Sequence, residues 1–159
     1  MEFIAEPLTA EAFAPFGAVF DYPARNGRFF CNAELGNARG AACFDLSVAR
    51  LEPMRQLPLH ATVMERHQYS SQTFLPLAVR RYLVIVAPAA ADGGPDTERV
   101  RAFVAHGRQG MTYRMDTWHH GLTVLDEAGE FAVLMWCDGS AGDEEFRTLD
   151  RPYTVSIPG

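Results

Sequence analysis

The chain has 159 residues, of which 48% are hydrophobic and 11% aromatic, and this composition predicts a globular protein that closes its core without disulfides. The formal net charge of −6 and the pI near 5.3 argue against nucleic acid or an anionic membrane as a partner, since both bind basic surfaces. Lysine is absent from the sequence, which excludes enzymes that use a lysine Schiff base or a phosphate-loop lysine.

The cysteines and the N-terminus indicate where the protein works. Cys31, Cys43 and Cys137 are odd in number and form no CxxC pair, so we expect them to be reduced and mostly buried, in a cytoplasmic protein. The first residues are too polar and too few for a signal peptide, and no apolar run approaches the length of a membrane span. We therefore expect one soluble domain over residues 1–159.

The first part of the chain predicts a few short elements. Residues 3–4 are typical of an edge strand. Thr9 is placed as the N-cap of a short helix over residues 10–16, which Pro15 and Gly17 end. Further strands are expected over residues 18–20, 28–31 and 43–48.

From residue 58 onward, strand signals recur at the short, regular spacing of a sandwich or barrel. We expect strands near residues 60–69, 72–77, 81–87, 101–105, 118–125 and 130–137, and residues 153–157 form one last strand or a packing arm. Residues 89–97 predict an exposed turn, and residues 107–117 predict a loop because they contain Gly110 and several polar side chains. Few helices and many strands predict an all-β, closed architecture.

Polar side chains gather around a Ser-Ser turn in this second part. Side chains alternate between the faces of a strand, so Glu65 and His67 share one face, and Gln72 shares a face of the next strand with Phe74. A later strand carries His119. If these faces turn inward, a carboxylate, two imidazoles and a carboxamide converge inside the barrel.

This pattern resembles a known family. Glu65-x-His67-x4-Gln72, followed by Pro at 76, Gly at 107 and Trp-His at 118–119, resembles the two-part signature of the cupins. More narrowly, segments 64–67, 71–76, 101–103 and 118–120 together resemble the ureidoglycolate lyases, cupins of allantoin (purine) catabolism. The resemblance implies a cupin-like β-barrel (jelly roll) with a short N-terminal helix. It also implies a homodimeric carbon–nitrogen lyase that cleaves ureidoglycolate to glyoxylate and urea.

The resemblance also implies a metal site. Glu65, His67, Gln72 and His119 occupy the four ligand positions of the cupin pattern, and a divalent metal, with nickel suspected, is the implied cofactor. Gln72 is neutral and Glu65 replaces an imidazole. The remaining carboxylate and two imidazoles suit Ni, Fe, Mn or Zn, with Gln72 as a weak oxygen ligand or a substrate-binding amide. This donor set allows a metal without requiring one.

The implied reaction assigns roles to further residues. Elimination from ureidoglycolate needs a base for the hydroxyl proton, an acid for the leaving nitrogen and a cation for the carboxylate. We expect His67 or His119 to be the base, with Glu65 orienting an imidazole or binding metal. Arg101 is the first choice for the carboxylate clamp, although it could equally be an exposed strand residue. Tyr113, in the predicted loop, would either touch the substrate or pack against the barrel.

Other interpretations stay open at this point. The same ligands would serve another small-molecule cupin, such as a sugar-acid isomerase or a dioxygenase, or a non-catalytic cupin that senses a small anion. Glu65 and His67 could also form a satisfied structural pair, although the later His119 favours a site. His120 should face away from His119 on the same strand, in a structural role or at a subunit contact.

Overall fold

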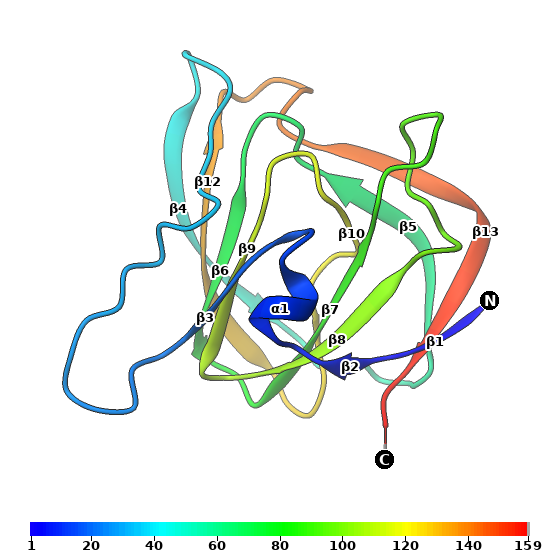
Figure 1. Ribbon diagram of the computed structural model, residues 1–159, viewed down its shortest axis with the longest axis horizontal. Coiled ribbons are helices and arrows are strands. Elements are labelled where there is room, and N and C mark those ends of the chain that lie inside the picture. The colour runs from blue at the N-terminus through cyan, green and yellow to red at the C-terminus, as the bar shows by residue number, and fades with distance from the viewer. Residues whose placement is uncertain (159) are drawn as a thin grey trace.

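The computed structural model describes residues 1–158. In this part of the chain thirteen strands form two sheets, and there is one short helix (Figure 1). This arrangement confirms the predicted fold class of a β-barrel with a short N-terminal helix. No helix in the described part of the chain has the length and apolarity needed to cross a membrane.

The larger sheet has eight strands and curls until it is nearly closed. Its edge strands, β1 and β2, are separated along the chain only by Ala5. The strands follow the order β1 (Glu2–Ile4), β13 (Glu145–Ser156), β5 (Leu59–Arg66), β10 (Trp118–His119), β7 (Arg81–Ala87), β8 (Arg101–His106) and β2 (Glu6–Pro7), with β11 (Thr123–Val124) also paired to β7. Because β1 pairs with β13, the first and last strands lie side by side (Figure 1).

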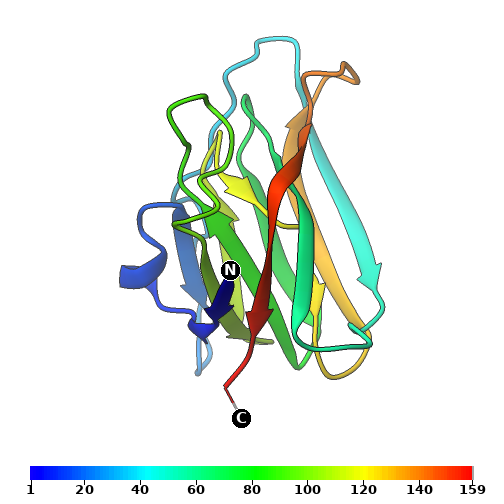
Figure 2. The same cartoon turned by 90° about the vertical axis from the view of Figure 1, so that its right-hand side faces the viewer.

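The smaller sheet has five antiparallel strands. Their order is β3 (Gly17–Asp21), β9 (Gln109–Tyr113), β6 (Gln72–Ala78), β12 (Gly129–Cys137) and β4 (Cys43–Leu51). Among the described strands β4 pairs with β12 alone, so it forms one edge of this sheet. Figure 2 shows β4 and β12 together at one side of the molecule.

Strand β7 is buried on both faces and separates two hydrophobic clusters. Leu83 and Ile85 point into a cluster with residues of β5, β10 and β13. Val84 and Val86 point into a second cluster, which lies between the sheets because it also contains residues of β6, β9 and β12. Burial on both faces explains the unbroken apolar run of this strand.

Helix α1 (Ala10–Phe13) begins where the sequence predicts and covers the second cluster. The Thr9 hydroxyl accepts a hydrogen bond from the Ala12 amide at 3.1 Å, as an N-cap does. Phe13 is fully buried, and its ring packs against those of Phe103 and Tyr113, with centroids 5.8 and 6.0 Å away. This contact joins the helix to both sheets.

Several predicted segments differ in the structure. The helix expected over residues 10–16 ends at Phe13, and the strand expected over residues 153–157 is the end of the longer β13. The strand expected over residues 28–31 is absent; this stretch is a loop in which Phe29 packs on Phe20 with ring centroids 6.1 Å apart. The strand expected over residues 118–125 is interrupted and forms β10 and β11. The loop expected over residues 107–117 contains β9. Gly110 belongs in that strand because a Cβ there would lie 2.8 Å from the Leu75 side chain.

Candidate active site

The larger sheet brings together three of the side chains that the sequence analysis selected. Glu65 lies near the end of β5, and His119 in β10 is its direct partner across the two strands. His67 follows one residue after β5 ends. One ligand atom of each of these three residues lies within 4.8 Å of those of the other two. They form a compact cluster of one carboxylate and two imidazoles.

His119 is oriented by backbone and by stacking. It is 1% exposed, and its Nδ1 lies 2.8 Å from the carbonyl oxygen of Thr117. A carbonyl only accepts hydrogen bonds, so Nδ1 carries a proton. The ring of Tyr113, from the other sheet, stacks on the imidazole with centroids 4.1 Å apart and planes 17° apart. The stack holds Nε2 toward Glu65.

His67 is held in the same way by another part of the chain. Its Nδ1 lies 2.8 Å from the carbonyl oxygen of Asp143, and the side chain is buried. Nδ1 therefore carries the proton here too, and Nε2 is buried without a hydrogen-bond partner. The ring centroids of His67 and His119 are 5.4 Å apart. Two Nε2 atoms without a hydrogen-bond partner thus belong to one cluster.

The charges of the cluster are set by burial and by its own members. Burial and then the neighbouring His119 hold the pKa of His67 below its ordinary value, so this imidazole is neutral at pH 7. Burial acts to raise the pKa of Glu65, but the imidazoles of His119, His67 and His120 outweigh it and lower that pKa. Glu65 Oε1 lies 3.4 Å from His119 Nε2. The cluster is therefore a carboxylate with at least one neutral imidazole.

Two more polar atoms in this part of the interior lack partners. Gln72 and Tyr113 are paired across β6 and β9, and directly opposed residues of an antiparallel pair share a face. Gln72 Oε1 and the Tyr113 hydroxyl are buried without a hydrogen bond, as are Nε2 of His67 and His119. Buried polar atoms are rarely left unpaired, so four such atoms on residues that face one interior indicate a site built for a ligand.

The donor set fits a divalent metal. Glu65, His67 and His119 supply one carboxylate oxygen and two imidazole nitrogens, the types that Zn, Ni and Fe bind. Each histidine donates its other ring nitrogen to a carbonyl, as metal-binding histidines do. The chain therefore has a possible metal site at this cluster. Gln72 as a fourth ligand stays a prediction.

Arg66 anchors the strand that carries Glu65. It lies next to Glu65 in β5 and so points to the other face, where its guanidinium lies 4.5 Å from the ring of Trp118. Its Nε donates to Glu145 at 2.8 Å, and its Nη1 lies 3.0 Å from Asp116. These contacts attach the end of β5 to β13 and to the loop before β10.

Arg101 does not join the cluster. Arg101 in β8 and His119 in β10 lie on either side of β7, and each is paired with Val86 of that strand. The Arg101 guanidinium, however, donates from Nε to Glu6 at 3.1 Å and from Nη1 to the Ala12 carbonyl at 2.7 Å. A role as a carboxylate clamp would require Arg101 to leave Glu6, and that role stays a prediction.

The sequence analysis missed how close His120 lies to the cluster. β10 ends at His119, so strict alternation does not apply to the next residue. The charge of His120 contributes to lowering the pKa of Glu65. Burial lowers the pKa of His120 itself, and its Nδ1 lies 2.8 Å from the Gly121 carbonyl oxygen. Trp-His-His was the available signal, but a strand of two residues could not be predicted from it.

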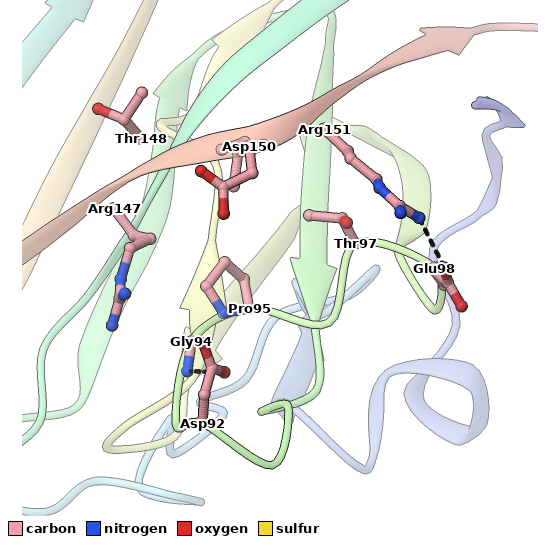
Figure 3. Close-up of a pocket in the computed structure, with 10 residues that line it drawn as sticks. Asp92, Gly94, Pro95, Thr97, Glu98, Arg147, Thr148, Asp150 and Arg151 are labelled. Atoms are coloured by element: carbon pink, nitrogen blue, oxygen red, sulfur yellow. Dashed lines mark hydrogen bonds and ion pairs between the residues drawn. The ribbon is translucent and has the colours of Figure 1, made fainter.

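A hollow apart from the cluster lies between residues 92–98 and β13, and Figure 3 shows its lining. It contains neither histidine nor any other residue of the cluster. Arg151 in this hollow pairs with Glu98 at 3.3 Å, and Asp92 accepts from the Gly94 amide at 3.0 Å. Arg151, Glu98 and Asp92 therefore have partners, unlike the four polar atoms of the cluster.

Comparison with known proteins gives one family. Residues 1–156 match the family model described as ureidoglycolate lyase. The chain is 42% identical to ureidoglycolate lyase 1 of Rhizobium meliloti, covering 96% of this chain and 92% of that protein. It is 38% identical to the ureidoglycolate lyase of Pseudomonas savastanoi pv. phaseolicola, covering 82% and 81%. These matches extend over the strands that form the cluster.

Among solved structures, the chain resembles a dTDP sugar isomerase from Desulfovibrio desulfuricans G20. The TM-score is 0.52 at 14% identity, covering 85% of this chain and 83% of that one. At this identity the likeness bears on the fold alone, and it supports the predicted cupin-like barrel.

Proposed function

Because the chain belongs to the ureidoglycolate lyase family, we propose that it cleaves ureidoglycolate to glyoxylate and urea at the cluster of Glu65, His67 and His119. One observation carries the assignment of the site: two imidazoles with free Nε2 atoms lie beside a carboxylate in a buried cluster. The reaction places the protein in allantoin and purine catabolism.

The proposed reaction matches the groups that the cluster offers. The substrate carbon bears a hydroxyl, a carboxylate and a urea nitrogen. A base removes the hydroxyl proton, the carbon–oxygen bond becomes a carbonyl as the carbon–nitrogen bond breaks, and the leaving nitrogen takes up a proton. Nε2 of His67 or His119 is the base, and the same imidazolium can return the proton to nitrogen. The lowered pKa of His67 keeps it in the base form at pH 7.

The other polar atoms bind and orient the substrate in this proposal. The Gln72 amide and the Tyr113 hydroxyl, both with free hydrogen-bonding capacity, would contact the ureido or carboxylate group. Burial holds the pKa of Tyr113 well above its ordinary value, so the hydroxyl stays a donor. Both side chains come from the smaller sheet, opposite the imidazoles.

We propose nickel as the metal, held by Glu65 and by whichever of His67 and His119 is not the base, since an Nε2 lone pair that binds metal cannot take up a proton. The motif resemblance suggests nickel, and the donor types support a divalent ion of this kind. When bound, such an ion lowers the pKa of a coordinated hydroxyl and offsets the substrate carboxylate charge. Metal analysis of the purified protein tests the identity.

The test of the function is release of urea and glyoxylate from ureidoglycolate by the purified protein. His67→Ala should lower kcat/KM by about 10²–10⁴-fold, the usual contribution of a general acid or base. His106→Ala is the matched control, because His106 is exposed at the end of β8 and outside the cluster. Full activity in a folded His67→Ala protein would reject the site, and no activity in the unaltered protein would reject the function.

We also propose a single-domain homodimer that works in the cytoplasm. The three free cysteines support a reducing compartment, although they are not buried as expected: Cys43 is exposed, and Cys31 and Cys137 are partly buried. The outer face of β4 supports a dimer, because Phe44, Leu46 and Val48 are each more than half exposed on it. Exposed apolar patches of this kind mark protein contacts, and a two-fold dimer is the most common closed assembly.

A further inference from the structure

The orientation of His67 depends on a loop from another part of the chain. His67 lies beyond the end of β5, where its carbonyl accepts a hydrogen bond from the Asp116 amide at 2.9 Å. The contact to its Nδ1 comes from the Asp143 carbonyl, in the connection between β12 and β13. The position of that carbonyl therefore decides which ring nitrogen of His67 carries the proton.

The carboxylate of Asp143 closes this loop. Its Oδ1 accepts from the Asp138 amide at 3.0 Å and its Oδ2 accepts from the Gly139 amide at 2.8 Å. The Asp143 amide in turn donates to the Ser140 carbonyl at 3.1 Å. One residue thus presents its side chain to the start of the loop and its carbonyl to His67.

Arg39, from a distant part of the chain, binds this loop through its guanidinium. Its Nη1 donates to Asp138 Oδ1 at 2.9 Å, its Nη2 donates to the Asp143 carboxylate, and Nη2 also lies 3.3 Å from the Trp136 carbonyl oxygen. The Arg39 side chain is only 15% exposed, although it carries a full charge. Burial of this kind is unusual for a surface ion pair and indicates a structural task.

The segment of Arg39 is itself fixed to the turn that follows His67. The Ala38 amide donates to the Tyr69 carbonyl at 2.9 Å, and the Ser71 amide donates to the Gly36 carbonyl at 2.9 Å. The guanidinium lies over the Tyr69 ring at 5.5 Å. Arg39 therefore connects the chain just after His67 to the loop that accepts the hydrogen bond from His67.

We propose that Arg39 is a positioning residue for His67, acting through Asp143 to hold the tautomer with the proton on Nδ1 and the lone pair on Nε2. The inference rests on the proposed function, since it explains how the base is prepared. A planar guanidinium contacts two carboxylates and a carbonyl at once, which a lysine ammonium cannot reproduce in the same geometry.

The experiment compares Arg39→Ala and Arg39→Lys with the matched control Arg81→Ala. Arg81 also pairs with one carboxylate through two nitrogens, at 2.9 and 2.6 Å from Asp126, but it lies at the start of β7, outside the cluster. Three readouts are used on the full chain: ¹⁵N spectra of the histidine rings, affinity for zinc as a diamagnetic probe, and kcat for urea release.

In the unaltered protein and in Arg81→Ala, His67 should carry its proton on Nδ1 alone. In Arg39→Ala a signal of the Nε2-protonated ring should appear, with zinc affinity and kcat reduced by about 10–100-fold, the usual effect of losing an outer partner of a ligand. Arg39→Lys should lie between them. A folded Arg39→Ala protein with only the Nδ1 tautomer and unchanged zinc affinity would overturn the proposal.

A second variant covers loss of folding. If Arg39→Ala does not fold, Asp143→Asn replaces the accepting carboxylate while keeping its shape, and the same spectra and zinc titration decide the question. If the unaltered protein releases no urea, the proposed function fails, but the ring tautomer and the zinc affinity still test the role of Arg39. The two failures are thereby distinguished.

Discussion

Both site imidazoles are oriented by backbone carbonyls and not by acidic side chains. Thr117 and Asp143 each accept from an Nδ1, so both Nε2 atoms are left for chemistry. A carbonyl fixes the tautomer without adding a second negative charge beside Glu65. The charge of the cluster is then set by one carboxylate, which suits an anionic substrate better than several carboxylates would.

At the scale of single residues, we predict that Tyr113→Phe lowers activity without lowering stability. The ring stacks on His119 and should stay in place, while the buried hydroxyl without a partner is removed. Stability should be unchanged or slightly raised, because an unsatisfied polar atom is lost. The value of kcat/KM should fall by about tenfold, as expected for one hydrogen bond to the substrate of roughly 1.5 kcal/mol. Thermal unfolding and steady-state kinetics measure both.

Tyr153→Phe is the control for that prediction. The Tyr153 hydroxyl is also buried without a partner, but the residue belongs to the other hydrophobic cluster. It should show the same effect on stability with no change in rate. Equal rates for the two variants would remove Tyr113 from substrate binding.

The sequence predicted the residues of the site better than their partners. Alternation on a strand and the spacing to His119 were sufficient to select Glu65 and His67, which the structure brings together. The carbonyls of Thr117 and Asp143 could not be selected, because every residue has a carbonyl and only the fold decides which one reaches a ring. Arg101 was chosen for its charge, but its neighbour Glu6 comes from a distant edge strand.

At the scale of elements, the buried strands were recognised unequally. β7 has a continuous apolar run and was predicted within its observed bounds, Arg81–Ala87. β9 is equally buried but carries Gly110 and polar side chains, so it was read as a loop. Gln109 donates to the Leu8 carbonyl at 3.2 Å, and Thr112 pairs with Thr73 at 2.7 Å. The sequence does not show that such polar side chains are buried, because their hydrogen-bond partners are distant in the chain.

The turn between β8 and β9 gives a prediction at this scale. A Cβ at Gly107 would lie 1.9 Å from the Val79 carbonyl oxygen, so Gly107→Ala must displace one of two backbones. We expect a loss of about 1–3 kcal/mol in the free energy of unfolding, as for other overpacked positions. Gly27→Ala is the control, because its Cβ would meet only the Arg25 oxygen at 3.8 Å. Urea unfolding that gives equal midpoints for both variants would contradict this reading of the turn.

At the scale of the whole molecule, one face remains without a covering. On the outer side of the smaller sheet, Phe44, Leu46 and Val48 lie opposite Trp136, Leu134 and Ala132 of β12. Phe44 and Trp136 pack edge to face, with ring centroids 5.5 Å apart, and Leu77 of β6 is 57% exposed. The alternation of residues 43–48 predicted a strand, but a single chain cannot tell which face a second copy would cover.

The proposed dimer predicts the effect of a charge on this face. A two-fold interface contains each residue twice, so Leu46→Glu would place two carboxylates in it. The dissociation constant should rise by at least about tenfold for a penalty of roughly 1.4 kcal/mol, and light scattering should show a shift from twice 17.6 kDa toward the monomer mass. Ser47→Glu is the control, because Ser47 is exposed on the other face of the same strand. An unaltered protein of 17.6 kDa at all concentrations, or equal masses for the two variants, would reject this face as the dimer contact.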